Sequence, residues 1–166
     1  MKQLTSLRAL MAEHKVDALI VPGTDPHASE YIAAHWQERN YVSAFTGSAG
    51  TAVITADGGC LWTDSRYFIQ AEEQLADTGF KMMKEDGPEA IDLVGWIVDN
   101  MPSGSTVAID GMTFSTALAE KIEQQLSGNG LKLITDFAPF DTINPERPKR
   151  PLNVLFVHDE KIVGET

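Results

Sequence analysis

The chain has 166 residues, 43% of them hydrophobic and 22% charged, a composition typical of one globular domain. Its formal net charge of -11 argues against binding to nucleic acid or to an anionic membrane surface. The single cysteine, Cys60, cannot form an internal disulfide, which favours a reducing compartment. Residues 1–17 lack the apolar segment of a signal peptide, and no run is long enough to span a membrane. We therefore predict a soluble, cytoplasmic protein.

The N-terminal part of the chain predicts a helix, a strand and a turn-rich segment. Apolar residues at helical spacing predict an amphipathic helix that ends near His14. The apolar run 17–23 ends in a Pro-Gly pair and predicts a strand buried on both faces. Residues 25–36 are expected to be helical or turn-like, because Asp25 can cap a helix and Pro26 suits its first turn.

Three strands are then predicted in quick succession, over residues 41–47, 51–59 and 60–64. The glycine breaks at Gly47 and Gly58 predict hairpin-like turns, and hence an antiparallel part of the sheet. Further along, helices are expected at 66–77, 89–101 and 115–128, and strands at 80–85, 105–111 and 131–137. This order of elements predicts an α/β sandwich, with a mixed sheet covered by helices on both faces.

The character of the chain changes after Phe140. Residues 144–151, "NPERPKRP", hold three prolines among basic residues and are interpreted as a linker. The apolar run at 153–157 predicts a strand, so residues 152–166 are expected to be the truncated start of a second domain. Residues 1–143 form the first domain in this division.

Several patterns in the sequence suggest chemistry without completing a known site. Residues 46–51, "TGSAGT", could hold a phosphate, but they lack the lysine of a Walker loop, and a tight turn is the favoured interpretation. The four histidines lack metal-ligand spacing. Asp64, Asp110 and Asp136 each lie near the end of a strand candidate, where carboxylates can hold divalent ions as in nucleases, although turn and cap roles explain them as well.

A polar and aromatic cluster occupies the predicted strand-to-helix corner at residues 62–67. Asp64 can bond to Arg66 or cap the helix that follows, and the indole N–H of Trp62 requires a partner. From these residues alone, a structural corner and a recognition surface both remain open. No nucleophile with a base, and no matched pair of carboxylates, is recognisable.

Three segments in this order and spacing resemble a known family. They are "DPHASEYI" at 25–32, "YVSAFTGSAGTAVIT" at 41–55 and "LWTDSRYFIQAEEQL" at 61–75. Together they resemble the N-terminal domain of three-domain Xaa-Pro aminopeptidases, also called aminopeptidase P. The resemblance extends into the linker, and residues 153–166 are similar to the start of the family's middle domain. Ala44 departs from the pattern, because a glycine is expected there.

The resemblance implies an activity that this chain does not contain by itself. In the family, a dinuclear metal site, usually manganese, activates water to release the N-terminal residue of peptides whose second residue is proline. Its ligands, two Asp, one His and two Glu, lie in a C-terminal domain. No position of this chain therefore inherits a catalytic or metal-binding role, and no cofactor is expected in it.

The resemblance also implies a fold, partners and site residues. The fold is a creatinase/prolidase N-terminal domain, a three-layer α/β/α sandwich of ribonuclease-H-like topology. Arg66, Tyr67, Trp62 and His27 are the candidates for contact with the substrate cleft or an interface. Asp64, Gly47 and Gly50 are assigned a structural role at the corner.

The implied partners are the protein's own middle and catalytic domains, a peptide substrate and further copies of the chain. Two other functions remain open: an assembly module that never touches peptide, and a ribonuclease-H-like nuclease.

Overall fold

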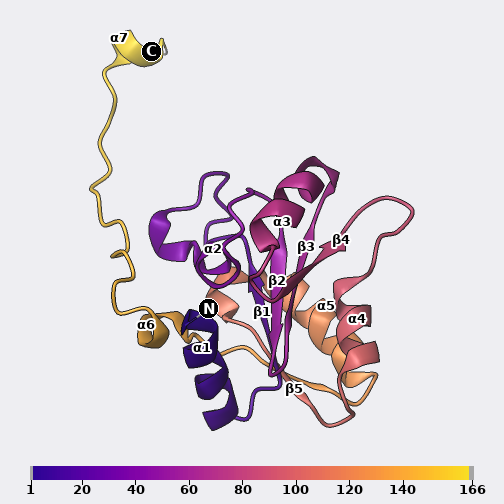
Figure 1. The fold of residues 1–166 in the computed structure, drawn as a ribbon. Helices are drawn as coiled ribbons and strands as arrows, with labels where there is room; N and C mark the ends of the chain where they lie inside the picture. The colour runs from indigo at the N-terminus through magenta and orange to yellow at the C-terminus, as the bar shows by residue number, and fades with distance from the viewer. Residues whose placement is uncertain (1, 165–166) are drawn as a thin grey trace.

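A mixed six-stranded sheet lies at the centre of the computed structural model, which describes residues 2–164 (Figure 1). The strands are β1 Ala18–Pro22, β2 Thr51–Thr55, β3 Gly59–Thr63, β4 Phe80–Lys84, β5 Thr106–Ala108 and β6 Lys132–Ile134. Their order in the sheet is β4-β3-β2-β1-β5-β6. β1, β2 and β3 pair antiparallel, whereas β4 joins β3, β5 joins β1, and β6 joins β5 in parallel. An antiparallel meander extended by parallel strands is the expected ribonuclease-H-like arrangement.

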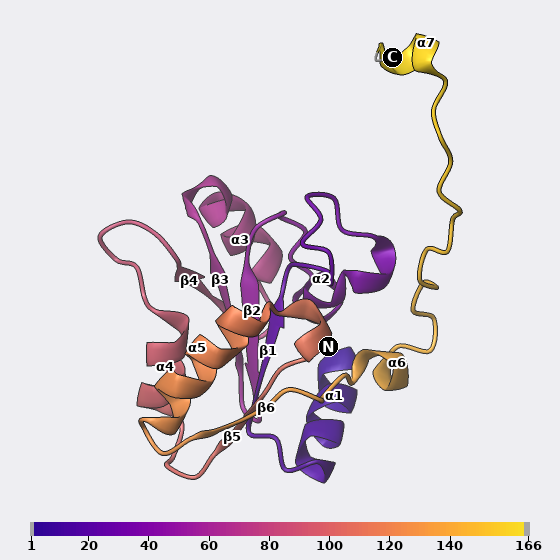
Figure 2. The same cartoon turned by 180° about the vertical axis from the view of Figure 1, so that it is seen from behind.

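Helices cover both faces of this sheet, so the predicted three-layer sandwich is confirmed. The helices are α1 Lys2–Glu13, α2 Glu38–Ser43, α3 Phe68–Leu75, α4 Leu93–Asn100, α5 Thr116–Ser127, α6 Phe140–Ile143 and α7 Glu160–Val163. The short 3₁₀ helices are η1 Ala34–Trp36, η2 Ser65–Tyr67 and η3 Gly111–Thr113. α4 and α5 lie together on one face, and α1, α2 and α3 lie on the other (Figures 1 and 2). None of the helices within residues 2–164 is long and apolar enough to cross a membrane.

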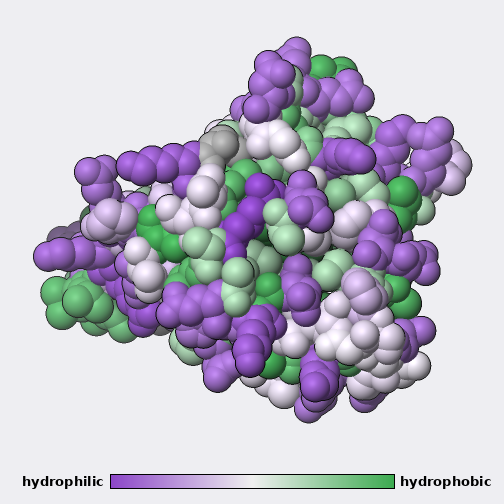
Figure 3. Space-filling model, turned by 60° about the horizontal axis from the view of Figure 1, so that its bottom comes forward, coloured by the Kyte–Doolittle hydropathy of each residue, from purple (hydrophilic) through white to green (hydrophobic). Residues whose placement is uncertain are grey.

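The alternation of side chains along β1 explains why two cores form. Leu19 and Val21 point to the core beneath α1 and α3, whereas Ala18 and Ile20 point to the core beneath α4 and α5. All four are at most 2% exposed, as a central strand between two helical layers requires. Figure 3 shows one face of the surface, where hydrophilic side chains predominate and apolar side chains lie in groups between them.

The strand predicted at 41–47 is wrong, because residues 38–43 form helix α2 and residues 44–47 follow it without regular structure. The aromatic and β-branched residues of this segment favour a strand locally, but α2 buries Val42 in the core beneath α1. The helix ends at Ser43, and its C-cap residue Ala44 has a left-handed φ of 65°. This conformation favours glycine, which explains physically why a glycine is expected at this position.

The C-terminal segment extends away from the sandwich (Figures 1 and 2). Residues 151–159 contain no strand, so the strand predicted at 153–157 is absent from this chain. Leu155 and Val157 are almost fully exposed there, at 101% and 98%. The short helix α7 follows and buries no residue.

Candidate functional site

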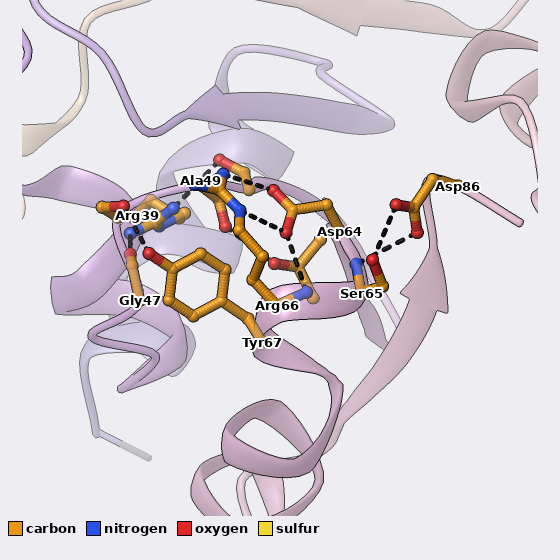
Figure 4. Close-up of polar contacts among 11 residues, drawn as sticks. Arg39, Gly47, Ala49, Asp64, Ser65, Arg66, Tyr67 and Asp86 are labelled. Atoms are coloured by element: carbon orange, nitrogen blue, oxygen red, sulfur yellow. Dashed lines mark hydrogen bonds and ion pairs between the residues drawn. The ribbon is translucent and has the colours of Figure 1, made fainter.

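The corner after β3 is built around a hydrogen-bonded ion pair between Asp64 and Arg66. The carboxylate of Asp64 accepts hydrogen bonds from Arg66 N, Nε and Nη2 at 3.0, 2.9 and 2.7 Å (Figure 4). Asp64 therefore caps η2 and also fixes the guanidinium, and these bonds hold the pKa of Asp64 below its usual range. The Arg66 side chain is nevertheless 68% exposed. The corner thus presents a cation in a fixed orientation to solvent.

Tyr67 links this corner to the glycine-rich segment 46–51. Its hydroxyl lies 2.6 Å from Ser48 Oγ, and this hydrogen bond lowers the pKa of Tyr67. The Arg66 Cζ atom is 5.2 Å from the centre of the Tyr67 ring, within cation–π distance. On the other side of the corner, Ser65 donates to Asp86 from both N and Oγ, at 3.0 and 2.9 Å. The corner is therefore held to both neighbouring loops.

Trp62 belongs to the core rather than to the exposed part of this corner. Its side chain is 2% exposed, its Nε1–H donates to the carbonyl of Ile91 at 2.7 Å, and its ring packs against Trp96. The indole N–H of Trp62 therefore has its hydrogen-bond partner within the domain, in the carbonyl of Ile91.

Gly47 and Gly50 occupy positions where a side chain would collide with the corner. A Cβ atom on Gly47 would lie 2.3 Å from the Phe45 ring, and one on Gly50 would lie 2.6 Å from the carbonyl oxygen of Trp62. Gly50 also has a φ of 150°. Gly47 therefore lets the loop pack closely against the rings of Phe45 and Tyr67, and Gly50 lets it approach the backbone of Trp62. Residues 46–51 lead into β2, not into a helix, so they lack the geometry of a phosphate-binding loop.

Arg39 holds these glycines in place and was not anticipated from the sequence. It is 6% exposed, and its guanidinium donates to the carbonyl of Gly47 from Nη2 and to that of Gly50 from Nη1, at 3.1 Å for the latter. Burial lowers the pKa of Arg39 to about 10. A lone arginine in a polar segment carries no local signal of burial, because its acceptors come from a different loop.

His27 lies in an exposed turn at the edge of the described domain. Asp25 is buried and accepts from His27 N and Ser29 N at 2.9 and 3.1 Å, which makes residues 25–29 a turn and not a helix. The His27 side chain is exposed on this turn. The segment ends at Tyr31, which is 87% exposed.

A second polar cluster joins residues 144–150 to the domain. Arg147 forms ion pairs with Glu38 and Asp141 and donates from Nε to the carbonyl of His35 at 2.9 Å. The guanidinium carbons of Arg147 and Arg150 lie 5.5 and 5.1 Å from the Trp36 ring centre. The sequence identifies this segment only by its prolines, and the contacts show that it packs on α2 and η1.

The aspartates at strand ends are used structurally. Asp110 caps η3 by accepting from Met112 N at 2.9 Å, and its backbone forms an isolated bridge with Asp136. Within residues 2–164, no group of three or more His, Cys, Asp or Glu side chains could hold a metal ion.

This chain belongs to the creatinase/prolidase N-terminal domain family, whose model matches residues 3–143. It is 39% identical to aminopeptidase P1 of Lotus japonicus over 98% of the chain, which corresponds to 25% of that protein's length. It superposes on the X-prolyl aminopeptidase of Caenorhabditis elegans, a cytosolic enzyme with a di-nuclear active site, with a TM-score of 0.88 and 31% identity. That match covers 99% of this chain and 28% of the C. elegans chain.

The same fold is found in the N-terminal domain of another peptidase. The N-terminal domain of the cytoplasmic peptidase PepQ from Mycobacterium tuberculosis matches with a TM-score of 0.64 and 20% identity. This match covers 86% of the present chain and 98% of the chain that forms the PepQ N-terminal domain. The chain therefore corresponds to the N-terminal domain of aminopeptidase P relatives and spans about a quarter of their length.

Proposed function

We propose that this chain is the non-catalytic N-terminal domain of a metal-dependent, cytoplasmic Xaa-Pro aminopeptidase, where it helps to shape the substrate cleft. The similarity to aminopeptidase P1 of Lotus japonicus, over 98% of this chain, carries the proposal. Residues 2–164 offer no group of ligands that fits a dinuclear metal centre. We therefore assign the metal, manganese or another divalent ion, to a catalytic domain outside the chain.

Arg66 and Tyr67 are the residues that we assign to the cleft or to a domain interface. Arg66 is oriented by Asp64 yet exposed, so its remaining N–H groups are free to meet an oxygen acceptor of a peptide or of a neighbouring domain. The Tyr67 hydroxyl lies beside it, bonded to Ser48. An orientation set before binding reduces the entropy cost of recognition.

The test compares Arg66→Ala with Lys84→Ala in the complete protein that contains this chain. Lys84 is a matched control because it also forms an exposed ion pair, with Glu89 at 2.5 Å. We expect Arg66→Ala to lower kcat/KM for an Xaa-Pro peptide about tenfold, which is about 1.4 kcal/mol of transition-state binding. Lys84→Ala should leave kcat/KM unchanged. Equal kinetics for both variants would remove the functional assignment of Arg66.

The alternative function is an assembly module that holds copies of the enzyme together without touching the peptide. If this alternative holds, Arg66→Ala should change the mass of the assembly measured by light scattering. It should leave the KM for the peptide unchanged. Measuring mass and kinetics on the same samples therefore separates the two functions.

A further inference from the structure

A pocket of about 220 Å³ opens beside Arg39, between the turn at 23–32 and the loop at 46–48. Its wall includes Arg39, the polar side chains of Gln37, Asn40 and Ser48, and the aromatic side chains of Tyr31 and Trp36. Sites for drug-sized ligands usually measure about 300–1,000 Å³. The volume therefore suits a single side chain or a terminal group.

The cation in this wall is incompletely paired. A guanidinium has five N–H donors, and Arg39 uses Nη1 and Nη2 on the carbonyls of Gly50 and Gly47. Its Nε is buried without a hydrogen-bond partner, and no carboxylate within residues 2–164 forms an ion pair with it. The centre of the Phe45 ring lies 5.1 Å from Arg39 Cζ, and this cation–π contact does not neutralise the charge. A buried charge in this state is costly, so an anion in the pocket would gain binding energy from it.

Gly23 keeps the guanidinium next to the pocket. It lines the same wall, and a Cβ atom at this position would lie 2.6 Å from Arg39 Nη1. Any side chain at Gly23 would therefore push the guanidinium aside or fill the space in front of it. Because Glu30 also lines the pocket and the whole chain carries a net charge of -11, a singly charged ligand is favoured over a doubly charged one.

We propose that this Arg39 pocket binds a carboxylate group, and that Arg39 is its charge partner. The planar guanidinium matches a carboxylate in shape, and the side-chain amides of Asn40 and Gln37 in the same wall carry further N–H donors. Two sources share this chemistry: a free small carboxylate, and an acidic side chain of a peptide. The inference goes beyond the proposed function, because it concerns binding by this chain itself and requires no peptidase activity.

The experiment follows the Nε–Hε NMR signal of Arg39 and the amide signals of Gly23 and Ser48 in the 166-residue chain at about pH 7. The probes are acetyl-Gly-Asp-Gly-amide, its neutral analogue acetyl-Gly-Asn-Gly-amide, and sodium acetate against sodium chloride at equal ionic strength. We expect saturable shifts at these three residues, with the Asp peptide binding at least about tenfold more tightly than the Asn peptide. If acetate saturates these shifts with the same affinity as the Asp peptide, the ligand is identified as a free small carboxylate.

Variants test whether Arg39 is responsible. Gly23→Ala keeps the charge but displaces the guanidinium, and it should weaken the Asp peptide about tenfold while the amide spectrum stays dispersed. Lys132→Ala, on the exposed strand residue Lys132, removes one positive charge elsewhere and should change nothing. If Gly23→Ala does not fold, the Asp-to-Asn comparison on the unmodified chain decides alone. The proposal would be overturned if the Asp peptide, the Asn peptide and acetate all gave equal shifts. It would also be overturned if none of the three gave saturable shifts.

Discussion

Arg147 forms an ion pair with Glu38, which lies 109 residues earlier in the chain, and their side chains are only 8% and 5% exposed. The pair attaches residues 144–150 to helix α2. Where Glu38 is ionised, breaking this buried pair leaves its charge without compensation, so at about pH 8 we expect Arg147→Ala to lower the free energy of unfolding by about 3–5 kcal/mol. Urea unfolding measures this loss, with the exposed neighbour Lys149→Ala as the control. A loss equal to that of the control would contradict the role of the pair.

Glu38 should make the stability of the chain depend on pH. Burial raises its pKa from 4.5 to about 7, and Asp110 and Asp141 add to this rise while Arg147 opposes it. The folded chain therefore holds this proton more tightly than the unfolded chain does. The resulting stabilisation is complete below pH 4.5 and is lost as the pH rises toward 7.

Glu38→Gln tests this dependence, because glutamine does not titrate. Relative to this variant, the unmodified chain should lose up to about 3 kcal/mol of unfolding free energy between about pH 4 and about pH 8. Parallel stability curves for the two proteins across this range would show that Glu38 does not titrate there.

Asp64→Ala should destabilise the chain more than Arg66→Ala does. Asp64 caps η2 and accepts three hydrogen bonds from Arg66, so its loss should cost about 1 kcal/mol. Arg66 is largely exposed, and removing an exposed ion-pair partner should cost less. Urea midpoints in the reverse order would show that the guanidinium, and not the cap, stabilises the corner.

Ala44→Gly should stabilise the chain by about 1 kcal/mol, because a left-handed alanine costs about 1–2 kcal/mol and glycine recovers most of it. The φ of 65° at Ala44 motivates this substitution. Ala119→Gly within α5 is the control, and it should cost about 1 kcal/mol because glycine disfavours a helix interior. Thermal unfolding that shifts downward for both variants would show that Ala44 is not strained.

The sequence predicted most strands and helices, because each is marked by a local pattern. β1 is a continuous apolar run, β2 and β3 are separated by the Gly58 turn, and α5 has helical spacing ended by a glycine. The prediction of a strand at 41–47 is wrong, because the composition of this segment favours a strand and only contacts with the core select helix α2.

The candidate site was predicted less completely than the fold. The corner at Asp64 and Arg66 is a contact between residues two positions apart, so the sequence reveals it. Arg39 with Gly50, and Arg147 with Glu38, are contacts between residues distant in the chain. The hydrophobic periodicity of the sequence does not predict such pairs, because they depend on which loops the sheet brings together.

The last prediction concerns the boundary of the domain. Residues 152–157 expose their apolar side chains and pair with no strand, so they contribute little to the cores. We expect a chain that stops after Pro151 to keep its unfolding midpoint and to associate less, because an exposed apolar segment with unpaired backbone groups invites contact between copies.

A chain that stops after Asn144 is the matched control for this truncation. It lacks Arg147 and Arg150 as well, so it loses the buried pair with Glu38 and the contacts with Trp36, and it should be less stable by several kcal/mol. Urea unfolding and light scattering on the three chains separate these effects. Equal losses for the two truncations would place the tail in the domain's own core, and the stable unit would then extend beyond Pro151.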